Sequence, residues 1–481
     1  MKVRNAVCIF LAALVSVSLL VSCGGADDVV NPAADTTADA AESSETVTET
    51  TEPPSYVPEG LDFEGATVTL LGGDAVFKHY TMCTEQTGDG LNDALWDRYH
   101  KVGEQLNVTF DFLSENSTGA VNKITSTVLA GDDVYQLAIV QRATSIGTMV
   151  GQKMLTNWND MPYINLDGSY WYEDAIDSLR VGKFVYYTYG DIYPLSTHVM
   201  YYNKDIREAY SLDNPHELVL GGGWTIDRLI EMATAVPKDL NGDGQMNEND
   251  QYGISFGNTD QINTLMYGCG LTITTKDSDS VTLSPRTEKM VDVFEHIVNL
   301  FHTDNATYYK QLNKVTLVTG QVLFYTGTIH GARTYRDAEV EFGMLPYPKY
   351  NEEQEKYVSF LNTELMCIPS IADRELSGAV IQLMAENSAG VKEAYYDYLL
   401  KEKVARDPES KQVLDIIFGN AINDFIISYC GGMSNSKSMY NIPANLAIAG
   451  NSEFASAYDR IAEAVQAEID SVYETIMQSD K

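Results

Sequence analysis

The chain has 481 residues, with 32 Lys or Arg against 68 Asp or Glu and a formal net charge of −36 at pH 7. That length exceeds one ordinary domain and suits two. The negative charge disfavours nucleic acids and anionic membranes as partners, and it makes a strongly anionic ligand a poor candidate.

The N-terminus has the pattern of a targeting segment. Lys2 and Arg4 precede the apolar or small residues 6–22, a run that is shorter than the about 20 residues of a membrane-spanning helix. The run ends at Leu20-Val21-Ser22-Cys23, which resembles a bacterial lipobox. An ordinary cleaved signal or an N-terminal anchor is the alternative. We predict that residues 1–22 are a lipoprotein signal peptide and that Cys23 receives a diacylglycerol, which would hold the protein at the extracellular face of the bacterial membrane.

Residues 23–60 are predicted to form a disordered acidic linker that begins with the lipidated cysteine. Residues 24–60 contain nine Asp or Glu, no Lys or Arg, and many Ala, Thr and Pro. Such a composition buries too little apolar surface to offset chain entropy, and its like charges extend it. A spacer above the membrane and an inert leader both predict this disorder.

The next segment predicts an α/β domain. Strands and helices alternate over five consecutive stretches, namely 66–71, 91–106, 108–113, 121–129 and 134–140. This order implies right-handed crossovers and a mostly parallel sheet, in which ligands bind beyond the carboxyl ends of the strands. Asp74, Tyr80 and Arg142 follow such ends and are candidate ligand-binding residues, although each also fits a solvated loop.

Residues 154–191 are rich in aromatic side chains. The whole chain has 30 Tyr but only 15 Phe, which favours rings that carry a polar group. Sugars have flat C–H faces that stack on rings, and hydroxyls that need hydrogen-bond partners. Core packing explains most of these rings, but we select Trp171 and Tyr172 as candidate stacking residues and Asp191 as a group that orients hydroxyls.

Extended segments in the middle of the chain are predicted to cross between two lobes. Residues 191–204 lead into a second lobe, and residues 321–331 are the predicted return, where Thr328 follows small residues that let a ligand approach closely. Residues 341–348 are expected to rejoin the first lobe. A third crossing is predicted to start at residues 367–370.

Residues 239–250 have the spacing of a twelve-residue calcium loop. Side-chain oxygens occupy positions 1, 3, 5, 9 and 12, and Gly244 at position 6 permits a sharp turn. Position 12 is an Asp, which is shorter than the usual Glu, and a surface turn without metal is the alternative. Because hard cations prefer oxygen donors, we predict one structural Ca²⁺, held by Asp239, Asn241, Asp243, Gln245, Asn247 and Asp250.

The segments around this loop occur in a specific order. Gly223-Trp224-Thr225 opens a predicted helix before the loop, and Gln251-Tyr252-Gly253 follows it. With residues 87–108, 202–204 and 342–349, this order resembles the extracellular solute-binding proteins of ABC importers, in particular the sugar-binding branch often called family 1. The resemblance covers most of residues 61–430.

The resemblance implies two discontinuous α/β lobes joined by a hinge, with a ligand captured in the cleft between them. We assign residues 61–195 and 328–375 to lobe 1 and residues 196–327 and 376–481 to lobe 2. The implied ligand is a sugar or oligosaccharide, and the implied partners are ABC permease subunits. We expect a monomer without enzymatic activity.

A secreted carbohydrate-active hydrolase is the alternative function. Gly253-Ile254-Ser255-Phe256-Gly257 matches the G-x-S-x-G pattern of a nucleophile elbow. However, no HGGG-like oxyanion segment accompanies it, and no histidine stands in a context that marks a catalytic base. A glycosidase needs two carboxylates at a defined separation, and a sequence with 68 acidic residues leaves such a pair open.

The cysteines of the predicted mature body do not form a recognisable framework. They show no metal-binding spacing and are too few and too dispersed for a disulfide scaffold. A single bridge stays open, but we expect buried free thiols at Cys83, Cys269, Cys367 and Cys430.

Overall fold

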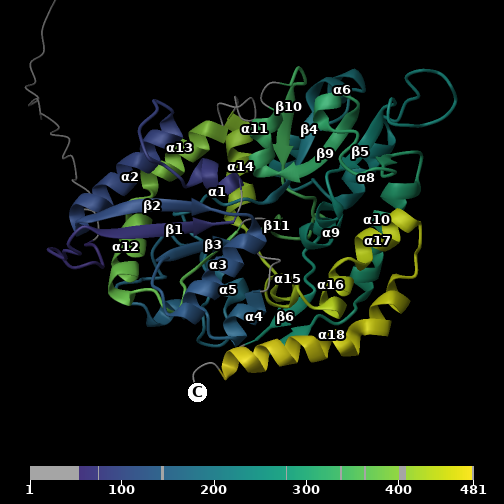
Figure 1. The fold of residues 1–481 in the computed structure, drawn as a ribbon. Helices are drawn as coiled ribbons and strands as arrows, with labels where there is room; N and C mark the ends of the chain where they lie inside the picture. Colours follow the sequence, from purple (N-terminus) through teal and green to yellow (C-terminus); the bar gives the residue numbers. More distant parts are fainter. Residues whose placement is uncertain are drawn as a thin grey trace, which may run out of the picture. The chain divides into compact units, whose positions relative to one another are not determined.

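The computed structural model of the chain describes residues 54–73, 75–141, 146–277, 279–335, 338–361, 364–399 and 408–478. Several predicted features lie outside these ranges: the signal peptide, Cys23, nearly all of the linker, Asp74 and Arg142. Two larger β-sheets with helices packed on them organise the described residues (Figure 1). Each sheet is the centre of one α/β lobe, so the predicted fold class is confirmed.

The first sheet has the strand order β12-β3-β1-β2. Strands β1 (Ala66–Gly72), β2 (Val108–Ser114) and β3 (Leu137–Val140) are parallel, as the alternation of strands and helices predicted. Strand β12 (Leu365–Cys367) comes from much later in the chain and runs antiparallel beside β3. The first lobe is therefore discontinuous, as expected.

Helices α2 (Gly90–Leu106) and α3 (Ser117–Ala130) connect these strands. Helix α2 begins after Asp89, whose side chain accepts hydrogen bonds from two N–H groups of the first turn and so caps the helix. Its predicted apolar face is confirmed, since the following side chains are all buried: Leu91, Leu95, Tyr99, Val102 and Leu106.

The second sheet has the order β10-β4-β9-β5-β8. Strands β5 (Tyr252–Phe256), β8 (Thr307–Tyr308) and β9 (Val322–Thr328) are parallel, whereas β4 (His198–Asn203) is antiparallel to β9 and to β10 (Phe342–Leu345). Strands β4, β5 and β10 are buried along their whole lengths, as expected for a sheet that is covered on both faces.

Two of the predicted crossings are wrong. Residues 321–331 do not return to the first lobe, because β9 is the central strand of the second sheet and pairs with β4 on one side and β5 on the other. Residues 341–348 do not rejoin the first lobe either, because β10 pairs with β4. The chain returns to the first sheet only at β12, after residues 359–361.

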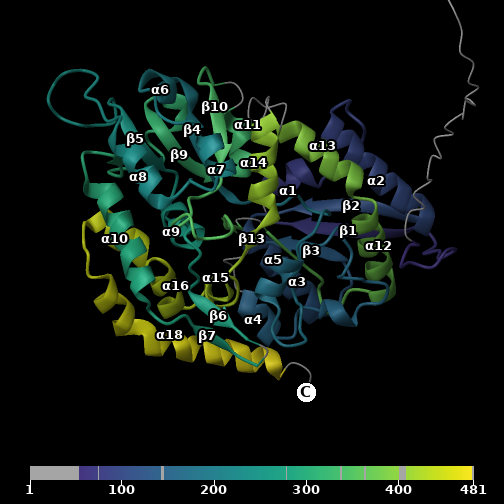
Figure 2. The same cartoon turned by 180° about the vertical axis from the view of Figure 1, so that it is seen from behind.

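The C-terminal part of the chain is divided between the lobes rather than confined to lobe 2. Helices α12 (Arg374–Glu386) and α13 (Ala389–Leu399) pack on α2 of the first lobe, whereas α14 (Pro408–Gly419) packs on β10 and α7 of the second (Figures 1 and 2). The burial of Leu376, Val380 and Leu383 explains why α12 stays with the first lobe.

Short elements complete both lobes and the layer of helices at the C-terminal end. Their bounds are α1 (Ala75–Tyr80), α4 (Ile146–Gly151), η1 (Trp158–Asp160), α5 (Glu173–Leu179), α6 (Lys204–Ala209), α7 (Pro215–Leu220), α8 (Ile226–Thr234), α9 (Thr259–Gly268), β6 (Thr274–Lys276), β7 (Val281–Leu283), α10 (Glu288–His302), η2 (Leu317–Thr319), η3 (Ile329–Gly331), α11 (Ala332–Tyr335), β11 (Ser359–Phe360), β13 (Ala421–Ile422), α15 (Phe425–Cys430), α16 (Ser434–Tyr440), α17 (Ile442–Ala449) and α18 (Phe454–Met477).

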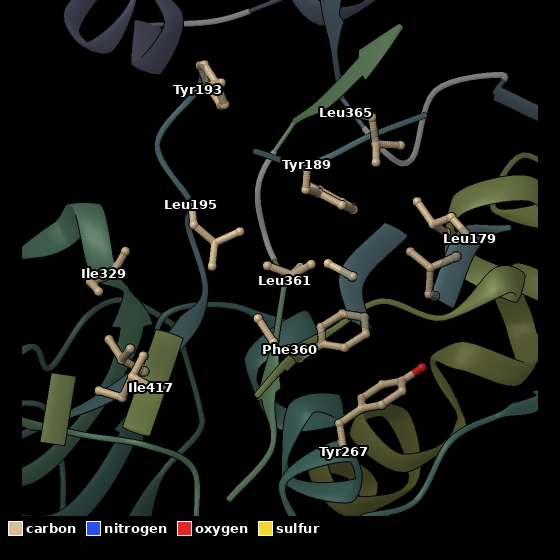
Figure 3. Packing of buried hydrophobic residues seen from close by; sticks show 14 of the residues in the cluster. Leu179, Tyr189, Tyr193, Leu195, Tyr267, Ile329, Phe360, Leu361, Leu365 and Ile417 are labelled. Carbon is tan, nitrogen blue, oxygen red and sulfur yellow. The ribbon is translucent and has the colours of Figure 1, made fainter. Parts of the chain in front are cut away.

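A buried apolar cluster joins the segments that run between the lobes. Thr197 forms an isolated bridge with Leu361, so the first crossing and the return crossing lie side by side. Figure 3 shows Leu195, Phe360, Leu361 and Tyr267 in this region. The Phe360 and Tyr267 rings stack with centroids 4.1 Å apart, which ties the return crossing to α9 of the second lobe. The predicted crossing near residue 191 is thus confirmed.

Two further expectations concern the thiols and the membrane. Cys83, Cys269, Cys367 and Cys430 are buried free cysteines, as expected. Burial raises the pKa of Cys269 to about 12, which keeps this thiol protonated and unreactive. None of the helices in the described ranges combines the length and apolarity that a membrane crossing requires.

Candidate ligand-binding site

Tyr80 lies where the two lobes meet. Its ring stacks on His330 of η3 with centroids 4.5 Å apart and contacts the edge of Tyr395 of α13 at 5.5 Å. Helix α1 follows the end of β1, and η3 follows the end of β9, so this contact brings together the residues beyond two strand ends. Tyr80 is 3% exposed and His330 covers one face of its ring, so the predicted contact of Tyr80 with a ligand stays a prediction.

Trp171 is part of the core of the first lobe. The side chain is 4% exposed, and its ring meets Trp158 edge-on at 5.6 Å. A Cβ atom at Gly190 would lie 2.4 Å from the Trp171 ring, so this glycine is needed for the close approach. The ring is thus enclosed in the core, and its predicted role as a sugar-stacking residue stays a prediction.

The structure brings Tyr172 and Asp191 together, but they bind each other. The Tyr172 hydroxyl donates a short hydrogen bond to one carboxylate oxygen of Asp191, and Lys392 of α13 donates to the other at 3.2 Å. Burial raises the pKa of Asp191, against the opposing effects of Tyr172 and Lys392. Burial and Asp191 raise the pKa of Tyr172 well above its usual value.

These three side chains line a small pocket beside the first crossing, together with rings from α13 and α14. The buried guanidinium of Arg98 on α2 donates to the Ile192 carbonyl at 3.1 Å and to the Ser388 hydroxyl at 3.0 Å. The polar atoms of Tyr172 and Asp191 therefore fasten the crossing segment to α13. Their predicted contact with a ligand stays a prediction.

Thr328 is the last residue of β9 and therefore lies at the carboxyl end of that strand. Its carbonyl oxygen accepts a hydrogen bond of 2.6 Å from the Tyr201 hydroxyl, which fixes the backbone where η3 begins. The side chain is half-buried. Asp74 and Arg142, the other predicted strand-end residues, lie outside the described residues.

The structure adds a polar group at the shared carboxyl end of β5 and β9 that our sequence analysis missed. Phe256 and Thr326 are paired in register, so the residues after β5 lie beside the end of β9. The Gln261 side-chain oxygen accepts hydrogen bonds of 2.8 Å from the Gly257 N–H and from the Thr326 hydroxyl. These two bonds fix the orientation of the Gln261 amide.

The other half of that amide is a free donor. The Gln261 side chain is 4% exposed, and its Nε2 group donates to no backbone or side-chain atom of the described residues. A Cβ atom at Gly257 would lie 2.7 Å from the Gln261 oxygen and 3.0 Å from the Tyr325 hydroxyl, which explains the glycine. The Tyr325 hydroxyl is itself held by Asn313 at 2.8 Å. The Gln261 Nε2 group is therefore a hydrogen-bond donor whose orientation is fixed by the protein.

The G-x-S-x-G pattern does not form a nucleophile elbow. Ser255 lies inside β5 rather than at a turn, and its side chain is fully buried. Its hydroxyl has no hydrogen-bond partner in the described part of the chain. A nucleophile needs access to substrate and an adjacent base, so Ser255 cannot serve as one in this arrangement.

The 239–250 loop has backbone features that a calcium loop needs. Gly244 at position 6 has φ +77°, in the left-handed region that favours glycine. Asp239 accepts hydrogen bonds from the N–H groups of Gly242 and Gly244 at 2.6 and 2.7 Å, which lower the pKa of its carboxyl group. Asp250 is buried and accepts from the N–H groups of Leu240 and Asn247.

The structure does not gather the three predicted carboxylates of this loop into one cluster. No cluster of three or more His, Cys, Asp or Glu side chains suited to a metal occurs in the described ranges. The predicted site combines the carboxylates of Asp239, Asp243 and Asp250 with two Asn side chains and a backbone carbonyl at position 7. Such hard oxygen donors fit calcium, and the Ca²⁺ assignment stays a prediction.

Solved structures share this fold at low sequence identity. A sugar transporter from Rhizobium etli in an open conformation has a TM-score of 0.59 at 13% identity, with 84% of this chain and all (100%) of that chain covered. An ABC substrate-binding protein from Listeria monocytogenes in complex with cycloalternan has 0.57 at 12%, covering 84% and 99%. A maltose-binding protein of the same organism, in complex with maltose, has 0.57 at 13%, covering 84% and 98%.

Sequence comparison gives the family. No curated protein matches the chain significantly. The family model described as bacterial extracellular solute-binding protein matches residues 96–398, which is more than half of the chain. That range includes the whole second sheet, three of the four strands of the first sheet, and the segments at residues 191–197 and 359–361 that run between the lobes. The chain is thus a member of the bacterial extracellular solute-binding protein family.

Proposed function

We propose that this protein captures a carbohydrate between its two lobes and presents it to the permease subunits of an ABC importer. The observation that carries the proposal is the fixed amide of Gln261 at the joined ends of β5 and β9. It offers a neutral hydrogen-bond donor to a ligand oxygen at the edge of the sheet where α/β proteins bind ligands.

An uncharged, hydroxyl-rich ligand suits the rest of the chain. The net charge of −36 works against anions at long range, whereas hydroxyls need only short-range hydrogen bonds. Among the proteins of the same fold, one is in complex with cycloalternan and another with maltose. These likenesses support a carbohydrate as the ligand class and leave its identity and length to experiment.

Binding without catalysis follows from the family, whose members are solute-binding proteins. The buried position of Ser255 agrees with this, because the one nucleophile motif in the sequence is inaccessible. Calorimetric titration with maltodextrins, cyclic glucans and monosaccharides tests the proposal. We expect saturable binding of one of these glycans and no release of new reducing ends. Stabilisation by peptides or anions alone, or the appearance of new reducing ends, would overturn it.

The lipid anchor is a separate prediction. We propose that Cys23 is acylated and becomes the mature N-terminus, on the basis of the basic, apolar and small-residue order that ends there. Cys23→Ala should release the protein from the membrane fraction and remove the mass of the lipid. Cys8→Ala, within the signal itself, is the matched control and should change neither property. Unchanged membrane association of the Cys23 variant would contradict the anchor.

Calcium binding by the 239–250 loop is also proposed, as a structural role remote from the ligand. A ligand that binds only the folded state stabilises it by RT ln(1 + [L]/Kd), about 2.7 kcal/mol at a hundredfold excess over Kd. The double variant Asp239→Ala with Asp243→Ala should abolish the rise in melting temperature that calcium produces, and should leave glycan affinity nearly unchanged.

The matched control for this loop is Glu248→Ala with Asn249→Ala. Both residues are exposed and stand at positions 10 and 11, which are not in the predicted ligand set. This control should keep the response to calcium. A wild-type melting temperature that is indifferent to calcium and to chelator would refute the site.

A further inference from the structure

Helix α18 leaves the second lobe and reaches back to the first (Figures 1 and 2). Its N-terminal half is fastened to the β6–β7 hairpin and the segment after it. The Tyr458 hydroxyl donates to the Ser284 carbonyl, and Arg286 forms an ion pair of 2.9 Å with Asp459. Further along, the Gln466 side chain accepts a hydrogen bond of 2.7 Å from the Leu283 N–H.

The last two turns of α18 pack on α4. Val472 is 7% exposed and Ile476 is fully buried. Gly151 of α4 permits this approach, because a Cβ atom there would lie 2.9 Å from the Thr475 methyl. At Gly147, a Cβ atom would be in ordinary contact with a Val472 methyl at 3.5 Å, and its close neighbour would be the Tyr429 carbonyl oxygen at 2.3 Å. The two helices therefore pack too closely for a side chain larger than hydrogen at Gly151.

Helix α4 belongs to the first lobe. The residues just after it are fixed to the chain that follows β12, because the Thr156 N–H donates to Ile368 at 2.8 Å and Leu155 bridges Pro369. Met477, at the end of α18, also lies against Gly182, in a turn of the same lobe. The contact of α18 with the first lobe is therefore separate from the chain crossings.

We propose that residues 471–477 form a C-terminal clasp, which holds the two lobes in the arrangement of this structure and restricts their hinge motion. If the contact between α18 and α4 forms in this arrangement of the lobes and is broken in another, it shifts the population toward this arrangement. This inference rests on the proposed function only in assuming that the lobes move when they capture a ligand.

The test is a distribution of interlobe distances in the full chain carrying Cys23→Ser. Spin labels would be placed at Ser126→Cys on α3 and Glu208→Cys on α6, both exposed positions, while the native cysteines of the body are buried. Gly151→Leu drives a side chain into Thr475, and a stop codon at Ser471 removes the clasp. We expect both changes to broaden the distribution and shift its mean by several ångström.

The matched control lies at the other end of the same helix. Arg286→Gln breaks the ion pair with Asp459 inside the second lobe and should leave the distances unchanged. Val472→Ala is a milder change in the clasp itself and should broaden the distribution to a smaller extent while the protein still melts cooperatively. Clasp variants with the wild-type distribution would overturn the inference.

The outcome also separates this inference from the proposed function. Maltotetraose and cyclic glucans are the probes. The clasp alone would be refuted if the interlobe distances of the wild type change with a glycan while the clasp variants have the same distances as the wild type. Wild-type distances that respond to none of the glycans that bind would refute capture between moving lobes, whatever the clasp variants do.

Discussion

Replacing Trp171 by alanine is expected to lower the free energy of unfolding by about 3–5 kcal/mol, the range for removal of a large buried ring. The ring is 4% exposed, packs against Trp158 and fills the space beside Gly190. Nothing adjacent can collapse into that space without moving the backbone near Gly190. Denaturant unfolding of wild type and variant measures the loss.

Trp96→Ala is the matched control for this prediction. Trp96 is a half-buried residue on α2 whose ring stacks on the exposed His100 at 4.5 Å. Its removal should cost about 1 kcal/mol, as for a typical partly exposed site. Equal losses for the two variants would show that Trp171 is not a core residue. If Trp171→Ala also bound glycans more weakly, the two results together would show that the Trp171 ring is part of the ligand-binding site.

Replacing Gln261 by glutamate is expected to weaken glycan binding by about 5- to 150-fold, the equivalent of about 1–3 kcal/mol for a lost polar partner. The substitution keeps an oxygen for the Gly257 N–H and the Thr326 hydroxyl, so the folded state retains both hydrogen bonds. Only the outward N–H donor is lost. Isothermal titration with the best glycan from the screen gives the ratio of dissociation constants.

Gln412→Glu adds the same charge at an exposed position on α14 and is the control for long-range electrostatics. It should leave the dissociation constant unchanged. The melting temperature of Gln412→Glu should stay close to that of wild type, whereas Gln261→Glu should melt lower, because it places a carboxylate at a side chain that is only 4% exposed. Unaltered affinity of Gln261→Glu would exclude this amide from the binding site.

Local patterns predicted the regular elements well. The parallel strands of the first sheet and the buried face of α2 followed from hydrophobic periodicity. The helix start at Thr225 followed from its side chain, which accepts a hydrogen bond from the Arg228 N–H. These features depend on residues that are close in sequence, so one segment contains all the information needed.

Long-range packing explains the errors. Residues 321–331 have the extended, small-residue character of a crossing, but the partners that make β9 a central strand, β4 and β5, come from distant segments. Trp171 matched a sugar-stacking residue in type, and only its contact with Gly190 and Trp158 places it in the core.

The missed role of Gln261 has the same origin. Nothing in its local sequence distinguishes it from other glutamines, because its orientation depends on Thr326, 65 residues away. One signal is visible with the structure in hand: Gly257 and Asn258 stand directly after β5, and Asn258 caps α9. Strand-end loops of that kind are where polar ligand contacts in α/β proteins arise.

Small-angle X-ray scattering of the full chain carrying Cys23→Ser, with and without a saturating glycan from the calorimetric screen, tests the central claim most directly. Capture between two lobes requires that the ligand favour the closed arrangement by contacts that the open one lacks, because equal affinity for both would shift nothing. We predict that the radius of gyration falls on binding. An unchanged radius of gyration at saturation would contradict capture by closure of the lobes.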